Sequence, residues 1–348
     1  MYQAQLKLLK RIPLSSANRF VIHKNHAYVC DLYGDAREIH VLDLNDPADP
    51  KQVRSIRFQN SIGSLAIREE KLYATESRRA LHEFDLDDAS DPKFLESYIL
   101  LGYDLYDLHF SSNQAILAMN WEGIGIVDLR KPDSIQPVPI QKTDKGFVEK
   151  LVPFGDNFLF VNNREFLYTI SALGGTLKNE DKKSFPNFKP SKIYPIGEEI
   201  VLYGETKKGK KEFSSILILD KNLQPIDEPI AIRYEPVDCI ALSDGNVLLC
   251  FDYSYASLDR KEKRILPLFE LFEDRNSKEY VEIPSKVRNK SQESDEEEDD
   301  YDPRKNDLYC FDSLRALRKI GNFLFTTYGK EFITFSVSED SLFQRIVE

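Results

Sequence analysis

A module of about 42 residues recurs along the chain, and this repeat constrains the fold more than any other feature. Each copy opens with two apolar strands joined by a turn. A third strand then ends in a pattern like Val-x-Asp-Leu, and a polar, proline-bearing link follows. The aspartates that close the third strands of the first three copies, Asp43, Asp85 and Asp128, lie 42 and 43 residues apart. That period is typical of a four-stranded β-propeller blade.

Seven copies can be counted, and in the later ones the Asp-Pro signature fades while the spacing is kept. The sequence therefore predicts an all-β protein, a single seven-bladed β-propeller domain over residues 1–348. We expect blades at 19–58, 62–98, 105–140, 148–184, 190–230, 237–272, and 312–348 together with 5–12. Two β-sandwiches in series are the alternative. The segment 314–320 has the nearest approach to a helical period, but its place in the repeat predicts a strand.

The N-terminal segment 5–12 resembles the last strand of a blade and precedes the first full module. An open ring of blades would expose an unpaired sheet edge. We therefore expect this segment to join blade seven beside residues 332–337 and 341–347 and to close the ring.

The first three modules carry a more specific signature. It comprises residues 27–31 with 41–53, 72–76 with 83–95, and 123–138, in which Asp-Leu-x-x-Pro or Asp-x-Pro follows the third strand. Over residues 19–140 the chain resembles the LVIVD repeats, a family of bacterial and archaeal β-propeller repeats. The resemblance implies a propeller fold and supplies no catalytic residues.

Charge is concentrated in one place. The net charge is −11, and Glu293–Asp302 holds eight acidic residues without a basic one, so the rest of the chain carries −3. A nearly neutral body argues against nucleic acid as the partner. We expect residues 274–307 to be a disordered acidic insertion between blades six and seven. It is either an arm for a basic partner, with Ser291 and Ser294 as phosphorylation sites, or a solvated loop.

Compartment and redox state follow from composition. The N-terminus lacks a signal-peptide core, and no apolar run reaches the length of a membrane span, so we expect a cytoplasmic protein that does not bind membranes. Four irregularly spaced cysteines favour free thiols. Cys239 and Cys250 should face each other if Asp244 and Gly245 form a two-residue turn.

The predicted binding face collects the loops at one end of the channel. The residues that end each second strand are Asp31, Glu76, Asn120, Asn162, Glu205, Asp252 and Tyr328. The facing loops add Tyr103, Asp104, Tyr106, Asp107, Tyr234, Glu235 and Asp238, with Trp121 at the same edge. These mostly polar residues either form a binding site for a cation or a basic partner, or are polar only because strands end at turns. Aromatic and acidic loops are typical of protein-binding surfaces.

The channel mouth should be lined by the starts of the innermost strands. These are Arg19, Asp107, Glu149, Lys150, Lys192, Asp238 and Arg315. Their mixed signs indicate either ion pairing across the channel or a ligand site.

No catalytic motif is present, and no histidine pair has metal-ligand spacing. We therefore predict a non-enzymatic protein-interaction module with no cofactor, no catalytic residues and no metal site. Its expected partner is another protein, a basic one, and an immunity-type or regulatory binding protein is the specific hypothesis. The alternative is a hydrolase or lyase at the channel mouth, whose metal-dependent form would use Asp31, Glu76, Asp107 and Asp252. The oligomeric state stays open.

Overall fold

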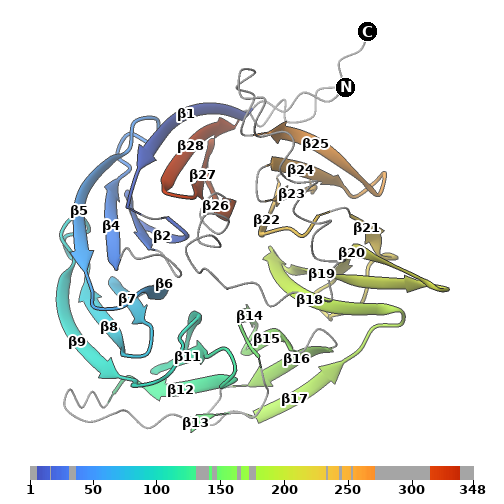
Figure 1. Cartoon of the computed structure of the whole chain (residues 1–348), viewed down its shortest axis with the longest axis horizontal. Helices are drawn as coiled ribbons and strands as arrows, with labels where there is room; N and C mark the ends of the chain where they lie inside the picture. The colour runs from blue at the N-terminus through green and yellow to red at the C-terminus, as the bar shows by residue number, and fades with distance from the viewer. Residues whose placement is uncertain are drawn as a thin grey trace, which may run out of the picture.

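The computed structural model describes residues 6–15, 17–30, 37–130, 141–142, 147–162, 166–171, 178–232, 234–242, 245–251, 254–270 and 314–337. The described residues form seven four-stranded antiparallel sheets arranged radially around one axis (Figure 1). The prediction of an all-β, seven-bladed propeller is confirmed. None of these residues lies in a helix long and apolar enough to cross a membrane.

Blades one to three occupy the first part of the ring. Blade one consists of β2 (Arg19–His23), β3 (His26–Cys30), β4 (Glu38–Asp43) and β5 (Lys51–Arg57). Blade two consists of β6 (Ile62–Arg68), β7 (Lys71–Glu76), β8 (Ala80–Asp85) and β9 (Lys93–Ile99). Blade three consists of β10 (Asp107–Ser111), β11 (Gln114–Ala118), β12 (Ile124–Asp128) and β13 (Gln141–Lys142).

Blades four to seven complete it. Blade four consists of β14 (Val152–Phe154), β15 (Asn157–Asn162), β16 (Phe166–Ser171) and β17 (Lys178–Lys183). Blade five consists of β18 (Phe188–Ile196), β19 (Glu199–Lys208), β20 (Lys211–Leu219) and β21 (Ile230–Ala231). Blade six consists of β22 (Asp238–Ala241), β23 (Val247–Cys250), β24 (Ser254–Asp259) and β25 (Arg264–Glu270). Blade seven consists of β26 (Leu314–Ile320), β27 (Phe323–Tyr328), β28 (Glu331–Val337) and β1 (Leu6–Pro13).

The ring closes through the N-terminal strand. β1 pairs antiparallel with β28, from Leu6 opposite Val337 to Pro13 opposite Glu331, and so becomes the outer strand of blade seven. The predicted closure beside residues 332–337 is confirmed. The segment 341–347 lies outside the described residues, as does the acidic insertion 274–307.

Burial follows strand position within each blade. The second strand of blade three, β11, is buried along its whole length, whereas the outer strand β5 is mostly exposed. Tight turns link inner to second strands. Between β6 and β7, Glu69 and Glu70 have φ of 50° and 59°, and Arg68 pairs with Lys71. A two-residue turn with both φ positive matches the twist of the flanking strands.

In the part of the chain that the structure describes, the core consists of seven apolar clusters, one at each interface between adjacent blades. In the cluster between blades one and two, Tyr28 and Ile39 pack with Leu72 and Phe84. In the cluster between blades seven and one, Phe20 packs edge-on to Phe332, with ring centroids 5.2 Å apart. Each sheet therefore hides its apolar faces against its neighbours, as repeat stacking requires.

The cysteine prediction was partly wrong. The loop between β22 and β23 spans Leu242–Asn246, so Cys239 pairs with Leu249 and Asp238 pairs with Cys250. Because neighbouring residues of a strand point to opposite faces, the two thiols do not face each other. Cys30, Cys239 and Cys250 are buried and form no disulfide within the described residues. Cys310 lies outside the described residues.

Candidate functional site

One face of the propeller gathers the ends of the second strands and the loops entering the innermost strands; we call it the loop face. Asp31 and Asp252 of the predicted ring lie outside the described residues. Glu76, Asn162 and Tyr328 end β7, β15 and β27 as expected.

Two members of the predicted ring do not end their strands, and a third ends its strand but is a core residue. Asn120 lies two residues beyond the end of β11, in a bridge with Val148. Glu205 does not end its strand, because β19 continues to Lys208. Tyr328 is buried in the cluster between blades six and seven and is therefore a core residue.

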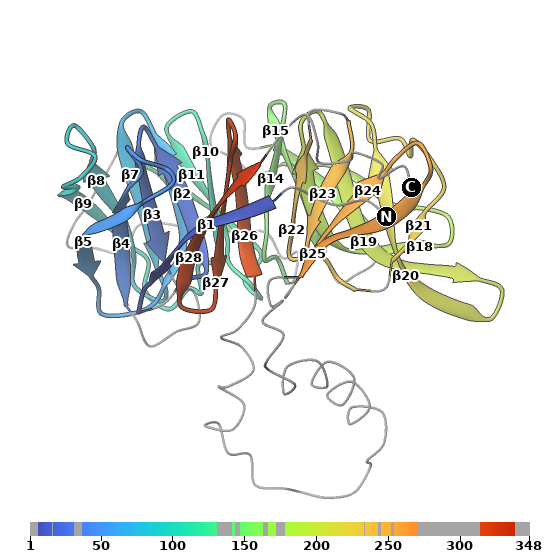
Figure 2. The same cartoon turned by 90° about the horizontal axis from the view of Figure 1, so that it is seen from above.

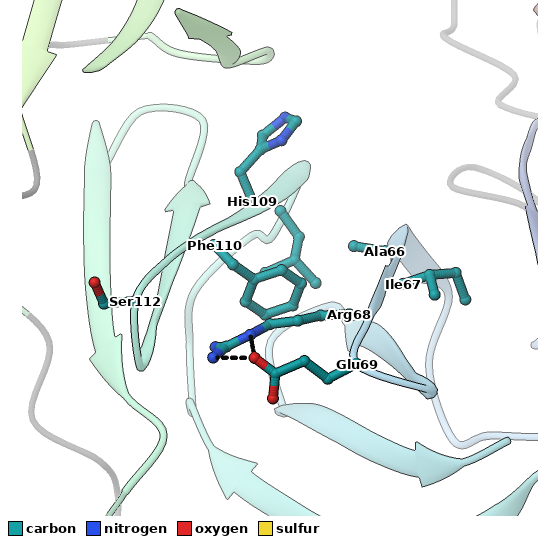
Figure 3. Close-up of a pocket in the computed structure, with 8 residues that line it drawn as sticks. Ala66, Ile67, Arg68, Glu69, His109, Phe110 and Ser112 are labelled. Atoms are coloured by element: carbon teal, nitrogen blue, oxygen red, sulfur yellow. Dashed lines mark hydrogen bonds and ion pairs between the residues drawn. The ribbon is translucent and has the colours of Figure 1, made fainter. Parts of the chain in front are cut away.

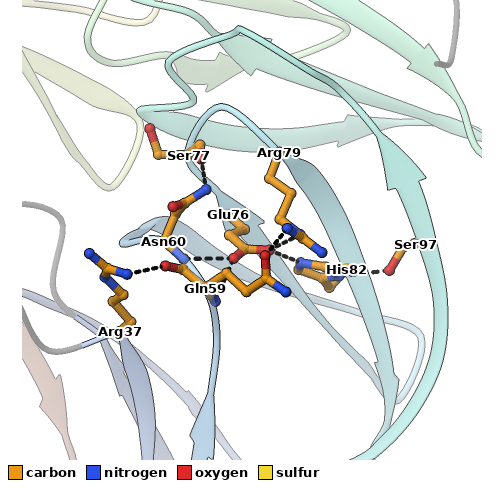
Figure 4. Close-up of polar contacts among 8 residues, drawn as sticks. All are labelled: Arg37, Gln59, Asn60, Glu76, Ser77, Arg79, His82 and Ser97. Atoms are coloured by element: carbon orange, nitrogen blue, oxygen red, sulfur yellow. Dashed lines mark hydrogen bonds and ion pairs between the residues drawn. The ribbon is translucent and has the colours of Figure 1, made fainter.

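Glu76 is 1% exposed and fully engaged inside the protein (Figure 4). Its Oε1 accepts hydrogen bonds of 2.7 Å from the backbone amides of Gln59 and Asn60, in the loop that enters β6. Its Oε2 lies 2.8 Å from His82 Nε2 and 3.1 Å from Arg79 Nε. Burial opposes ionisation, but the His82 and amide hydrogen bonds hold the pKa of Glu76 below its usual range. The carboxylate thus ties the loop to β7.

The hydrogen-bond chain continues from His82 to Ser97, whose Oγ lies 2.8 Å from His82 Nδ1. A Ser–His–Glu chain resembles a hydrolase triad, but blade one repeats it without the carboxylate. There His40 Nδ1 lies 3.1 Å from Ser55 Oγ, and His40 Nε2 lies 2.8 Å from Ser15 Oγ. Both histidines face their serines across the third and fourth strands. The repeated pair is therefore a structural element of the blades.

The two aspartates at the channel mouth join adjacent inner strands. Asp107 Oδ2 accepts a 3.0 Å hydrogen bond from the Leu151 amide of blade four. Asp238 Oδ2 accepts bonds from the Leu317 amide, at 3.0 Å, and from Arg318 Nη1, at 3.2 Å, both in blade seven. Each aspartate therefore links its blade to the next one in the ring.

The electrostatics of Asp107 follow from its neighbours. Burial by itself would raise the pKa of Asp107. His109, whose Nε2 lies 3.3 Å away, Arg19 and the Leu151 amide instead hold the pKa far below its usual range. Asp107 is therefore ionised at neutral pH in the folded protein.

The basic residues of the mouth are paired as well. Lys192 Nζ lies 2.8 Å from Glu149 Oε2 and 3.9 Å from Glu235 Oε1, on loops entering the blades on either side. Arg19 donates hydrogen bonds to the carbonyls of Gly63, at 3.0 Å, and Tyr106. Ion pairs and hydrogen bonds between blades thus account for the mixture of acidic and basic residues at the channel mouth.

Other residues of the mouth and loops also have partners inside the protein. Lys150 Nζ lies 4.8 Å from the centroid of the Tyr194 ring. Asp104 binds Arg78 through both carboxylate oxygens, at 2.7 and 3.2 Å, and Arg78 donates its amide hydrogen to the Tyr103 carbonyl. The side chain of Arg315 lies outside the described residues.

A hollow of about 430 Å³ opens between β6 and β10 (Figure 3). It is lined by Ala66, Ile67, Arg68, Glu69, Leu108, His109, Phe110 and Ser112. The Arg68 guanidinium lies 5.5 Å from the Phe110 ring centroid and 3.0 Å from Glu69 Oε1. The cation is thus already paired. Among the described residues, no three His, Cys, Asp or Glu side chains gather closely enough to hold a metal ion.

Among the described residues of the loop face, Trp121 is the most exposed large apolar one, at 72%. Its ring rests on Phe147, with centroids 4.9 Å apart. Backbone bonds fix the turn that presents it, from Met119 N to Gly123 O and in both directions between Asn120 and Val148. Asn120 and Gly123 have φ of 55° and 79°, which Asn and Gly tolerate best.

Similar solved structures share this architecture at low sequence identity. The WD40 domain of Neurospora crassa Pan2 is 8% identical, with a TM-score of 0.63 over 97% of this chain and 98% of that one. The β-propeller domain of Myceliophteria thermophila Cps50 (Swd1) is 11% identical, with a TM-score of 0.64 over 96% and 100%. The similarity is one of fold. No protein-family model matches the propeller, and no curated protein is similar to it in sequence.

Two features of the propeller were missed from the sequence. Phe147 lies outside every predicted strand, and only its bridge-forming neighbour Val148 places it beneath Trp121. The run of lysines at 207–211 could have been found as a charge cluster, but the expectation that the second strand ends at Glu205 hid it.

Proposed function

We propose that the protein is a non-enzymatic scaffold that binds another protein through the loop face. The observation that carries the proposal is Trp121, a mostly exposed indole held on Phe147 in a hydrogen-bonded turn. Tryptophan is enriched among the residues that dominate interface energies. A rigid turn also loses little conformational entropy on binding.

The fold agrees with such a role. One similar propeller, 8% identical with a TM-score of 0.62 over 96% of this chain and 93% of that one, belongs to the mitotic checkpoint complex. The same architecture therefore occurs in a multiprotein assembly. The cytoplasmic location and the LVIVD relationship stay predictions.

Fewer acidic side chains of the loop face are available to a basic partner than the sequence indicated. Glu76, Asp104, Asp107 and Asp238 all bind groups inside the protein. An acidic surface for an immunity-type role would then depend on Glu293–Asp302, outside the described residues.

The proposal is tested by comparing partner recovery for Trp121→Ala and wild type in quantitative affinity purification from native lysate. We expect recovery of a stoichiometric partner to fall at least about tenfold, since interface tryptophans cost more than about 1.4 kcal/mol when truncated. Phe94→Ala is the matched control, because Phe94 is also an exposed aromatic but lies on the outer strand β9. Equal recovery with both variants would contradict the proposal.

A second candidate is an enzyme that uses the Asp107–His109 pair beside the hollow. His109 is oriented by the buried carboxylate of Asp107, and enzymes often orient a general-base histidine in this way. Screening the protein and His109→Asn against ester, phosphoester and glycoside substrates tests it. A turnover that wild type shows and the variant lacks would favour this candidate.

A further inference from the structure

The hairpin of β19 and β20 ends in a lysine tip, formed by Lys207, Lys208, Lys210 and Lys211 around Gly209. All four side chains are exposed, and none of them forms an ion pair within the described part of the chain. Gly209 has a φ of 66°, as a tight turn requires. The tip therefore presents four cations on a protein whose net charge is −11.

The tip extends past the rest of its blade, as Figure 2 shows for the β19–β20 hairpin. The register of β18 with β19 ends at Phe188 opposite Thr206, and one more backbone bond joins the Lys207 amide to the Asn187 carbonyl, so the tip beyond Lys207 has no inner-strand partner among the described residues. On the other side, β21 pairs only with Ser215 and Ile216 of β20. Because β19 ends there, the tip lies on the loop face.

The edge of β20 next to the tip has backbone groups without a strand partner among the described residues. The Ser214 carbonyl accepts the Ile232 amide, so residue 214 faces the β21 side. In an antiparallel strand every second residue faces the same neighbour, and Glu212 therefore faces this open edge. An extended peptide could continue the sheet here.

We propose that the lysine tip binds a carboxylate-rich, extended segment of a protein partner, which lies along the open edge of β20. The inference rests on the proposed function, since it names the chemistry of part of the partner. Four lysines supply charge, and the Glu212 backbone supplies directional hydrogen bonds that an extended peptide can satisfy.

The observations favour an acidic peptide over nucleic acid. Phosphate-backbone binding gains most from a broadly positive surface, whereas here the positive charge is confined to one hairpin of an acidic protein. The tip holds lysines alone, without the arginine forks that bind phosphate with two bonds. The open strand edge adds backbone pairing, which nucleic acids do not offer.

The test measures fluorescence anisotropy of a labelled ten-residue oligoglutamate with the full chain at low salt. The variant carries Lys207→Gln, Lys208→Gln, Lys210→Gln and Lys211→Gln. We expect the affinity to fall at least about tenfold, as the sum of four exposed ion pairs. The charge-matched control carries Lys7→Gln, Lys51→Gln, Lys93→Gln and Lys221→Gln, and its affinity should change less than about twofold.

A second pair of variants tests the strand edge. Glu212→Pro removes the outward amide, and Glu212→Gln makes the same charge change with the amide intact. We expect the proline variant to bind oligoglutamate more weakly than the glutamine variant. Equal binding by these two variants would overturn the edge pairing.

Two results would overturn the proposal as a whole. One is oligoglutamate binding that the lysine variant and the control reduce equally. The other is binding of a 20-residue oligothymidylate in place of oligoglutamate, which would assign the tip to nucleic acid. Neither result changes the expected loss of the partner from the Trp121→Ala variant. Failure of this inference and failure of the proposed function are therefore distinguishable.

Discussion

Single carboxylates on the loop face hold loops and blades together. Glu76 binds two amides of the loop before β6, and Asp238 binds the Leu317 amide of the neighbouring blade. A buried carboxylate that accepts several hydrogen bonds is stabilised in its charged form, and removing it leaves the donors unpaired. Whether such a carboxylate stabilises the fold or is exposed to solvent therefore depends on its burial. An alignment of the repeats does not reveal burial.

Replacing Glu76 by glutamine should lower the free energy of unfolding at pH 7 by about 2 kcal/mol. The folded-state pKa of Glu76 lies below its ordinary value of 4.5, so its contribution is present above pH 4.5 and is lost as the pH falls through the lowered pKa. The difference between wild type and variant should therefore shrink below pH 4.5. Urea unfolding of both proteins at pH 7 and pH 4 measures it, with the exposed Glu228→Gln as control.

The link between blades six and seven gives a second prediction at this scale. Asp238→Ala should destabilise the fold by about 2–3 kcal/mol, because the Leu317 amide loses its charged acceptor. Arg318→Ala should cost less, since Arg318 is half-exposed. Thermal unfolding of the two variants checks the order, and a larger effect for Arg318 would contradict it.

At the scale of strands, the sequence predicted the order and the direction of the strands better than their lengths. Asp43, Asp85 and Asp128 recur because each accepts the backbone amide two residues later, which ends the third strand in an Asx turn. Such local bonds are visible in sequence. The extra length of β19 is not, because Glu205 and the lysines after it are all polar and the strand continues by pairing with β20.

Loop length and side-chain partners limited the site prediction. A five-residue loop in place of a two-residue turn moved Cys239 out of register with Cys250. Sequence placed Glu76 at its strand end, but its burial depends on Gln59 and Asn60 from a different loop. The sequence could therefore predict which residues end the strands. It could not predict whether their side chains are exposed to a partner, because this depends on contacts between loops that are far apart in the sequence.

The closing strand gives a prediction at the element scale. Ile12→Ala should cost about 2–4 kcal/mol, because Ile12 is buried in the cluster between blades seven and one. Leu8→Ala on the same strand should cost less than about 1 kcal/mol, since Leu8 is 42% exposed. Urea unfolding compares them, and equal small effects would contradict closure of the ring by this strand.

At the scale of the whole molecule, the seven described sheets bury their apolar faces at seven interfaces between blades. Trp121 and the lysine tip lie on the same face, on blades three and five. A partner that uses both must therefore reach across blade four.

Hydrogen–deuterium exchange of the protein, alone and with the partner recovered by affinity purification, tests the central claim of a binding loop face most directly. The account predicts slower exchange at residues 119–123 and 207–212 when the partner is bound. The turns at the opposite face, at 24–25, 69–70 and 197–198, should exchange at unchanged rates. Protection confined to those opposite turns, with the loop face unchanged, would contradict the account.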